Sequence, residues 1–266
     1  MSRIAAGLIV LWSLGPFLWF GLASIKGPEE VARRPPTVLP ERPTLEGYRL
    51  ATGEGLLRWM RNSAVVSVAT TLTGIPLAAM AAYALSRTRL RGRRAILALL
   101  LAVSMFPQVT LAPVLYQMLD RMGLVNTLAG PVVPYVTLSL PLSIWLLASF
   151  FREIPQELEE AARLDGAGPI RTLFRVFLPV AAPGLATASL LVFIQAWNEF
   201  FFALILLTRN ELKTLPVGIA TMPGQYTFPW GEVAAASVAA TAPLLAAALV
   251  FQRKILSGLT AGAVKG

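Results

Sequence analysis

The chain has 266 residues, of which 56% are hydrophobic and only 14% are charged, with a formal net charge of +9. Soluble domains are about 25% charged, so this composition, with a mean hydropathy of +0.65, excludes an ordinary soluble domain and indicates the lipid bilayer. There is no cysteine and no histidine, which excludes disulfides, Cys or His metal sites, cysteine nucleophiles and Ser-His-Asp triads.

Six apolar runs are long enough to cross a hydrocarbon core of about 30 Å, which takes roughly 20 helical residues. We expect spans at about 4–25, 62–86, 95–117, 129–151, 179–207 and 233–252, in a single membrane domain that covers residues 1–266. The last four runs contain prolines, so kinked helices are expected rather than straight rods. The first run also resembles a signal peptide, but it is longer than the usual apolar core of roughly 7 to 15 residues, which favours an uncleaved span.

Arginines in the short loops predict the orientation of the chain in the membrane. They crowd the turn between spans two and three and the turn between spans four and five: Arg87, Arg89, Arg91, Arg93 and Arg94, and then Arg152, Arg163, Arg171 and Arg175. The turns after spans three and five hold only Arg121, and Arg209 with Lys213. We therefore expect both arginine-rich turns, and with six spans both termini, on the cytoplasmic side.

The segment between the first two spans, residues 26–61, mixes basic and acidic residues and gives little information on orientation. By parity it lies outside. Its prolines predict an extended, ordered crossing: Pro35, Pro36, Pro40 and Pro43. Two interpretations stay open, a solvated connector and a docking surface for an external partner.

The loop between spans four and five, residues 153–178, is a charged, helix-forming island. Pro155 and the glutamates that follow it predict a helix start, where the backbone dipole favours anions. Glu159 and Arg163 lie four residues apart and can form an ion pair. Gly166 and Gly168 then end the helix. By composition alone, this elbow would merely anchor the loop to anionic lipid.

A second short amphipathic helix is expected after the turn, because apolar residues recur at helical spacing: Ile170, Leu173, Phe174 and Phe177. Leu178 and Pro179 then lead into span five.

The spacing within the island is more specific than its composition. Glu160-Ala161-Ala162, then Gly166, then Val176-Phe177-Leu178-Pro179 resemble the EAA loop of the permease subunits of ATP-binding cassette (ABC) importers, with valine where the family has isoleucine. The resemblance implies that this loop is the coupling helix that docks on an ATP-hydrolysing subunit. The coupling residues it implies are Glu160, Ala161, Ala162, Asp165, Gly166, Leu178 and Pro179.

Other stretches extend the resemblance along most of the chain. Residues 83–87, 150–155, 197–200 and 258–266 look like the carbohydrate branch of the family, and the chain is most similar to the MalG-like permeases of maltose- and trehalose-type importers. The resemblance implies an all-α membrane protein with the six-helix fold of type I ABC importer permeases. The coupling (EAA) helix would lie between spans four and five.

No ATP-binding site that could drive uphill transport is apparent in this sequence. A phosphate-binding P-loop needs Gly-Lys followed by Ser or Thr, and no lysine follows a glycine: Lys26, Lys213, Lys254 and Lys265. We expect a non-catalytic subunit with no cofactor or metal and no nucleic-acid partner. The resemblance implies that ATP and magnesium bind to two separate ATPase subunits. It also implies a homologous second permease, an external sugar-binding protein, and the cytoplasmic (inner) membrane of a prokaryote.

Polar residues within the spans are candidates for a solute pathway. Glu199 is the only charge between Arg175 and Arg209, and ionisable residues inside a membrane are candidate functional sites. Gln195 lies one turn earlier, and Trp197 and Asn198 are adjacent, which suits the hydroxyls and apolar face of a sugar. The alternative is hydrogen bonding between helices without solute contact. Gln108 and Tyr116 in span three are further candidates, with helix packing as the alternative.

The external segment 209–230 is rich in prolines and glycines, which argues against a flexible linker. In similar permeases this loop reaches the external binding protein, so we expect binding-protein contacts at Pro223, Gly224 and Gln225.

The leading function is that of a permease subunit of an ABC importer for an oligosaccharide or α-glucoside such as trehalose or maltose. Glycerol phosphodiesters and polyols stay open, because their permeases carry the same motifs. The rival from another class is a stand-alone six-span secondary carrier or channel. Such carriers often show Gly-broken spans at matching places in two repeats, and no such repeat is evident in this sequence.

Overall fold

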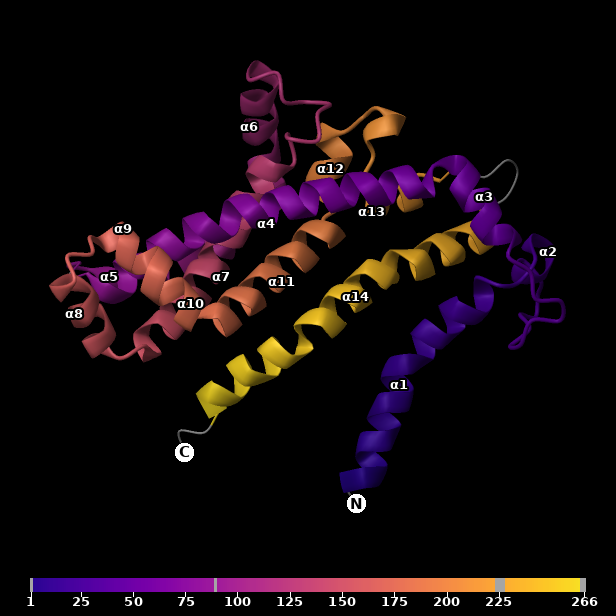
Figure 1. The fold of residues 1–266 in the computed structure, drawn as a ribbon. Coiled ribbons are helices and arrows are strands. Elements are labelled where there is room, and N and C mark those ends of the chain that lie inside the picture. The colour runs from indigo at the N-terminus through magenta and orange to yellow at the C-terminus, as the bar shows by residue number, and fades with distance from the viewer. Residues whose placement is uncertain (1, 89, 223–227, 264–266) are drawn as a thin grey trace. The chain divides into compact units, whose positions relative to one another are not determined.

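The computed structural model describes residues 2–88, 90–222 and 228–263, without the side chains of residues 2–4, 6 and 251–263, and every regular element in these ranges is helical (Figure 1). In chain order the helices are α1 (Ser2–Ala23), α2 (Pro28–Val31), α3 (Glu46–Glu54), α4 (Leu56–Arg87), α5 (Arg93–Ser104), α6 (Gln108–Arg121), α7 (Val132–Glu153), α8 (Gln156–Leu164), α9 (Pro169–Thr172), α10 (Leu178–Val180), α11 (Ala182–Asn198), α12 (Phe201–Leu206), α13 (Leu215–Ala220) and α14 (Trp230–Ala263). A π-helical turn, Leu173–Phe177, joins α9 to α10, and a 3₁₀ turn, Asn210–Leu212, precedes α13.

Three helices of the described chain are by themselves long and apolar enough to cross a membrane, namely α4, α7 and the Trp230–Val250 part of α14. Two bent pairs raise the number to five if each pair counts as one span: α5 with α6, and Pro169–Val180 with α11. The apolar part of α1, Gly7–Ala23, is shorter. The described chain therefore offers three to five candidate spans by length and composition, and the expected number of six stays a prediction.

The expected third span, residues 95–117, is broken into α5 and α6, which meet at an angle of 90°. Pro107 stands at the N-cap of α6, and because proline has no N–H it cannot continue the ladder of α5. At the end of α5 the N–H groups of Met105 and Phe106 donate hydrogen bonds to the carbonyl oxygens of Ala102 and Val103, three residues earlier in the chain. The expected kink is thus a full break between two helices, and α6 runs on to Arg121. Whether the pair forms one span stays a prediction.

The expected fifth span, residues 179–207, is also divided. α11 ends at Asn198, Glu199 is extended with ψ 128°, and α12 begins at Phe201. No proline causes this second break. The carboxylate of Glu199 accepts hydrogen bonds from the N–H groups of Phe202 at 2.9 Å and Ala203 at 3.3 Å. It thereby satisfies donors that the first turn of α12 would otherwise leave free.

Other helices extend beyond their apolar runs. α4 begins at Leu56 rather than near 62, and α14 continues to Ala263 rather than ending near 252. The extra turn of α4 holds Arg58 and Arg61, which are both exposed. Apolar length thus predicts how much of a helix can lie in lipid, but it does not predict where the helix ends.

The described chain groups into two compact units, the first made of residues up to Asn62 with Arg209–Leu245, and the second of Ser63–Thr208 with the residues from Ala246. In the first unit, Asn62 Nδ2 donates to Glu211 O at 2.9 Å and to Lys213 O at 3.0 Å.

The segment after α1 in the same unit is ordered, as its prolines predict. The Glu30 carboxylate accepts the Thr37 hydroxyl at 2.8 Å and the Glu41 N–H at 3.0 Å. The bond from Glu41 is the main cause that holds the pKa of Glu30 below its ordinary value.

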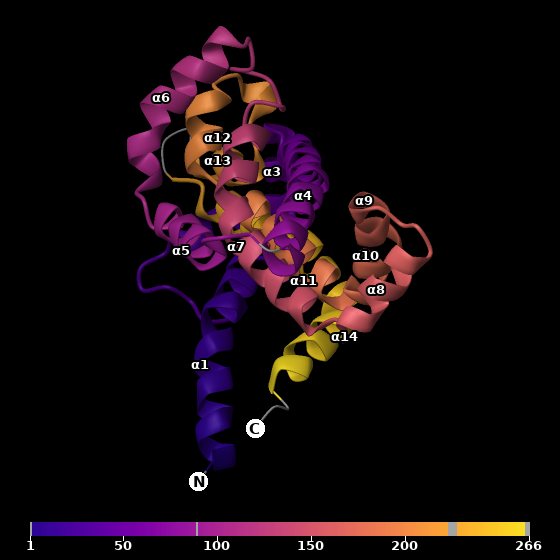
Figure 2. The same cartoon turned by 90° about the vertical axis from the view of Figure 1, so that its left-hand side faces the viewer.

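The second unit contains a core built by α4, α7, α11 and the π-helical turn, in which Leu147, Phe151 and Phe177 have no solvent exposure. Figures 1 and 2 both show α8, α9 and α10 gathered near the end of α7. α11 packs closely on α7 because Gly184 has no side chain. A Cβ at this position would lie 2.4 Å from the Phe150 ring. The core therefore holds the island rigidly against the long helices.

Candidate functional site: the α8 to α10 elbow

The sequence island folds as an elbow, which we define as residues Gln156–Val180. α8 begins after Pro155, and its first turn carries Glu157 and Glu159, which favours helix formation because the N-terminal dipole attracts anions. At its other end the chain turns through Gly166, whose φ is +75°. Ala167 N–H donates to Ala162 O at 2.9 Å and Gly166 N–H to Arg163 O at 3.0 Å, which is the Schellman pattern. The predicted helix stop at Gly166 is confirmed.

The second half of the elbow is not the regular amphipathic helix that the spacing predicts. After α9 the chain makes a π-helical turn over Leu173–Phe177, and the apolar residues divide between two sides. Leu173 and Phe177 are buried in the core, whereas Ile170 is 75% and Phe174 52% exposed. The elbow therefore carries an outward apolar surface as well as an inward one.

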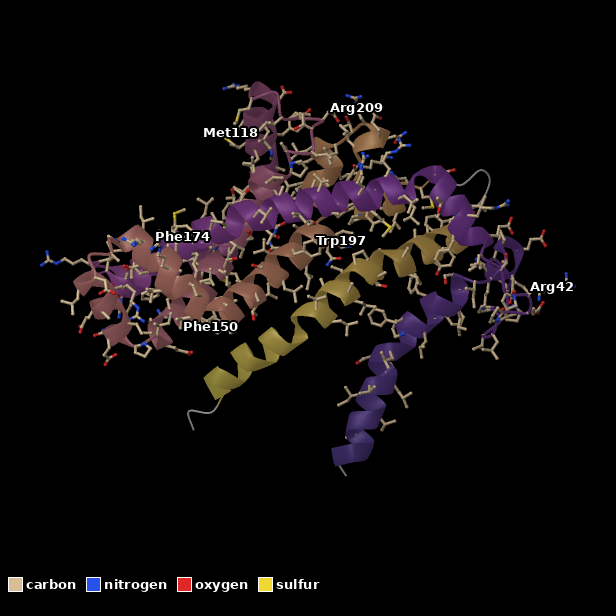
Figure 3. The ribbon with its side chains drawn as sticks, viewed as in Figure 1. Arg42, Met118, Phe150, Phe174, Trp197 and Arg209 are labelled. Atoms are coloured by element: carbon tan, nitrogen blue, oxygen red, sulfur yellow. The ribbon has the colours of Figure 1, made fainter. Side chains whose placement is uncertain are left out.

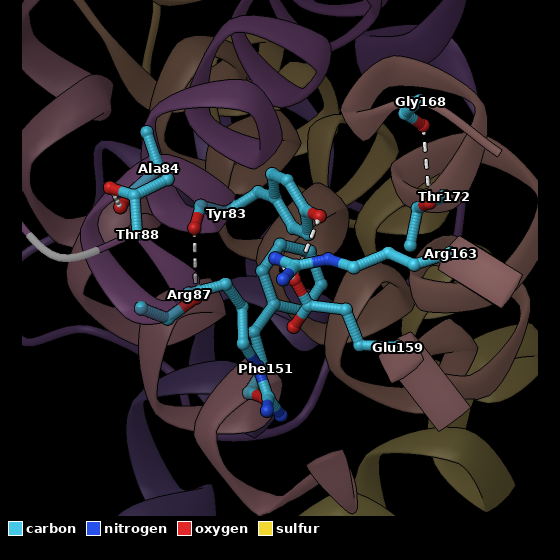
Figure 4. Close-up of polar contacts among 10 residues, drawn as sticks. Tyr83, Ala84, Arg87, Thr88, Phe151, Glu159, Arg163, Gly168 and Thr172 are labelled. Carbon is cyan, nitrogen blue, oxygen red and sulfur yellow. Dashed lines mark hydrogen bonds and ion pairs between the residues drawn. The ribbon is translucent and has the colours of Figure 1, made fainter. Parts of the chain in front are cut away.

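A buried carboxylate fastens α8 to α4. Glu159 is only 7% exposed, and its Oε1 accepts hydrogen bonds from Tyr83 Oη at 3.4 Å and from Arg163 Nη2 at 2.7 Å (Figure 4). The predicted ion pair between Glu159 and Arg163 is confirmed. Because the same oxygen also meets Tyr83, the pair does more than stabilise one helix. It ties the elbow to the end of α4.

Arg87 makes a second attachment between α4 and the end of α7. Its guanidinium donates to the carbonyl oxygens of Phe151 and Ile154 and lies over the Phe177 ring, 4.9 Å from the centroid. Tyr83 and Phe151 both meet the Phe177 ring edge-on, at centroid distances of 4.9 Å and 5.6 Å. Such aromatic contacts, and a desolvated cation over a ring, each stabilise the fold beyond what the burial of apolar area contributes. These contacts attach the elbow to α4 and to the end of α7.

The predicted coupling residues occupy both sides of this elbow. Glu160, Ala161, Asp165 and Gly166 are exposed, while Ala162 is buried. At helical spacing Glu160 and Ala161 share the outward face with Leu164, which is 90% exposed. Leu178 is half-buried and Pro179 is exposed. The structure thus brings Glu160 and Ala161 together on one surface and places Ala162 beneath it.

Sequence reasoning missed the attachment residues Tyr83, Glu159, Arg87 and Phe151 as members of one cluster. Tyr83 was noted only as part of a resemblance, Arg87 for that and for the orientation of the chain, and Glu159 for the start of its helix and its ion pair. The separations of 64 residues between Arg87 and Phe151 of α7, and of 76 residues between Tyr83 and Glu159 of α8, explain this. The available signal was a tyrosine and an arginine four residues apart at the end of an apolar helix, since these positions share a face.

The candidates for a solute pathway in α11 do not form one open surface. Trp197 is 3% exposed and stacks on Phe193 with ring centroids 5.8 Å apart. Trp197 lies near the C-terminal end of α11, far from Phe150 of α7, which packs near the N-terminal end of α11 (Figure 3). Asn198 is exposed and donates to Ile194 O at 2.9 Å. Glu199 is half-buried and caps α12 as described.

Gln195 lines a cavity. The cavity has a volume of about 230 Å³ between α7 and α11, and Ser139 and Ser143 supply its other polar groups. Gln108 and Tyr116 are exposed on α6, far along the chain from this cavity. Pro223, Gly224 and Gln225 lie outside the described residues. Within the described ranges, no cluster of three or more acidic residues could hold a metal ion.

Comparison with known proteins identifies the family of this chain. The family described as "Binding-protein-dependent transport system inner membrane component" matches residues 74–258, which include the whole elbow. The chain is similar to the trehalose/maltose transport system permease protein MalG of Thermococcus litoralis, with 42% identity over 99% of this chain and 95% of the relative. It is also similar to the sulfoquinovosyl glycerol transport system permease protein SmoH of Agrobacterium fabrum, with 40% identity over 99% and 93%.

A solved structure supports the same assignment. A chain of a bacterial ABC transporter involved in the import of the acidic polysaccharide alginate matches with a TM-score of 0.79 and 25% identity, over 96% of this chain and 95% of that one. The fold, the elbow and the sequence matches agree over nearly the full length. This chain belongs to the family of binding-protein-dependent transport system inner membrane components.

Proposed function

We propose that this chain is a membrane-spanning permease subunit of an ABC importer that takes up a carbohydrate delivered by an external solute-binding protein. A homologous second permease and two ATPase subunits complete the importer. In this proposal α1, α4, the α5 and α6 pair, α7, the α11 and α12 pair and α14 form six membrane segments. Both termini and the elbow lie in the cytoplasm. The arginine-rich turns and the family membership support this orientation.

The observation that carries the proposal is the exposed outer surface of an elbow that is otherwise fastened on its inner side. Leu164, Ile170 and Phe174 are the most exposed large apolar side chains of the elbow. On its inner side Glu159, Leu173 and Phe177 are buried. Exposed apolar patches with a polar rim mark sites that contact a protein or a membrane, and the charged residues of α8 favour a protein here. The surface therefore fits a partner, and the attachments to α4 and α7 fit the transmission of that partner's movement, as in hinge-type coupling.

The solute is proposed from the relatives. Their names specify trehalose or maltose and sulfoquinovosyl glycerol, and the structural neighbour imports alginate. All of these are glycosides, which supports a carbohydrate, and an oligosaccharide or α-glucoside such as trehalose or maltose is the leading candidate. Gln195, with Ser139 and Ser143 beside it, is the pathway candidate that faces a cavity. Hydroxyl and amide groups of this kind bind sugar hydroxyls.

Co-purification tests this proposal. Tagged protein, expressed in the source cells and purified in detergent, should bring with it a second permease and an ATPase, and ATP hydrolysis by the complex should rise on addition of the binding protein loaded with a glucoside. Trehalose and maltose are compared with glycerol phosphodiesters and with polyols. A chain that purifies alone and moves solute by itself in vesicles would instead be a stand-alone carrier, and the proposal would fail.

A further inference from the structure

A basic cavity lies at the turn between α4 and α5. It has a volume of about 670 Å³, and its polar lining comes from Ser86, Arg87, Thr88, Arg93, Arg94 and Gln156. Arg87 is occupied by the carbonyl groups of Phe151 and Ile154. Arg93 and Arg94 are exposed, and neither forms an ion pair with any residue that the structure describes. The cavity therefore presents two free guanidinium groups.

The surroundings of these two arginines do not neutralise them. No acidic residue occurs in the sequence between Arg61 and Asp120. Glu153 and Glu157 come closest in sequence to Gln156, but they do not line the cavity. Arg93 and Arg94 also form the first turn of α5, which has no side-chain cap and no acidic residue. Positive side chains at the positive end of a helix dipole are unfavourable unless an anion lies nearby.

The helix that leaves this cavity suits a lipid chain. Leu97 and Leu100 pack on the core of the second unit, while the other face is apolar and open. Ile96, Leu99 and Val103 recur at helical spacing and are 40%, 65% and 58% exposed. A free phosphate ion would gain nothing from this face, whereas an acyl chain would be buried against it. The charge of the cavity and the apolar face of α5 are thus continuous.

We propose that the cavity between the α4 to α5 turn and Gln156 binds the phosphate headgroup of an anionic phospholipid of the cytoplasmic leaflet, whose acyl chain lies along Ile96, Leu99 and Val103. The choice of leaflet rests on the orientation in the proposed function. Arg93 and Arg94 contact the phosphate through charge-assisted hydrogen bonds, and basic pockets at this depth of a membrane protein commonly bind anionic lipid. Because Arg87 and Gln156 line the same cavity, the lipid also supports the place where the elbow meets α4.

The test is lipid retention by the intact purified protein, with whatever subunits accompany it, measured by native mass spectrometry. The probes are dioleoylphosphatidylglycerol, dioleoylphosphatidylcholine and inorganic phosphate. Wild type should retain phosphatidylglycerol at least about tenfold more strongly than phosphatidylcholine, since hydrogen bonds to charged groups are among the stronger ones. The double variant R93Q/R94Q should lose this preference. The control R42Q/R121Q removes the same charge from two exposed arginines elsewhere and should keep it.

A folding defect in the variant is separated from lost binding in two ways. R93K/R94K keeps both charges and should retain most of the preference. Wild type alone should release phosphatidylglycerol as ionic strength rises, because salt screens exposed charges, while its retention of phosphatidylcholine should not change. Three results would overturn the inference: equal retention of both lipids by wild type, an unchanged preference in R93Q/R94Q, or displacement of phosphatidylglycerol by millimolar phosphate. None of these results bears on co-purification with an ATPase, so the proposed function is tested separately.

Discussion

At the scale of single residues, Glu159 is the side chain on which the elbow depends most. Its carboxylate receives hydrogen bonds from two elements, through Tyr83 on α4 and Arg163 on α8. Because these groups are buried, the loss of one partner would lower the stability of the protein, since a buried polar group without a partner keeps the full cost of desolvation. Glu160, the next residue, faces outward and has no such role. Of these two adjacent glutamates, Glu159 thus fastens α8 to α4.

Replacing Glu159 by alanine should lower the stability of the protein by about 1 to 3 kcal/mol, because it leaves the buried Tyr83 hydroxyl without its partner and frees Arg163. Thermal unfolding of the purified protein in detergent measures the effect. Glu157→Ala is the matched control, since Glu157 is exposed on the same helix and should change stability by no more than about 0.5 kcal/mol. Equal shifts in the two variants would show that the attachment through Glu159 contributes nothing.

The backbone conformation at Gly166 favours glycine. Its φ is +75°, and a Cβ at this position would meet nothing within 4 Å. Gly166→Ala should therefore cost about 1 to 2 kcal/mol from left-handed backbone strain, and Gly166→Asn less. Gly168 offers a control, because its φ is −72° and a Cβ there also meets nothing within 4 Å. If Gly168→Ala destabilises as much as Gly166→Ala, the strain explanation is wrong.

At the scale of helices, the apolar runs predict that a helix exists better than they predict whether it is continuous. The run that contains Pro107 and Pro113 is broken only at Pro107, because α6 starts there, and Pro113 is accommodated inside α6. Pro141 likewise lies inside α7. The break after α11 involves no proline and depends on the cap that Glu199 provides. Whether a proline or a carboxylate breaks a helix depends on packing and hydrogen bonds that the local sequence does not contain.

The contact between α7 and α11 gives a test of helix packing. Gly184→Ala would place a Cβ 2.4 Å from the Phe150 ring and should destabilise by about 1 to 3 kcal/mol through overpacking. Removing the ring with Phe150→Ala should reduce this penalty in the double variant, since residues in contact are not additive. Gly74→Ala is the control, because its nearest contact is Ser139 Oγ at an ordinary 3.5 Å. Purely additive effects of Gly184→Ala and Phe150→Ala would contradict the close packing.

At the scale of the whole molecule, the sequence predicts its class well and its contacts less well. Composition indicated a helical membrane protein, and the spacing around Glu160, Gly166 and Pro179 predicted the family that the comparisons confirm. Periodicity did not foresee that a π-helical turn would divide the apolar residues of the elbow between two sides. Nor did it predict that Trp197 would be buried while Gln195 lines a cavity. These features depend on contacts between segments distant in the chain.

The central claim is that the outward surface of α8 couples this chain to a separate ATPase. The most direct measurement is sugar uptake into proteoliposomes that contain the complete importer and ATP, with Glu160→Lys compared with Glu153→Lys. Both residues are exposed, but Glu153 ends α7 and lies outside α8. We predict that Glu160→Lys inserts normally yet loses uptake and its dependence on ATP, while Glu153→Lys transports like wild type. Normal uptake by Glu160→Lys would contradict the claim.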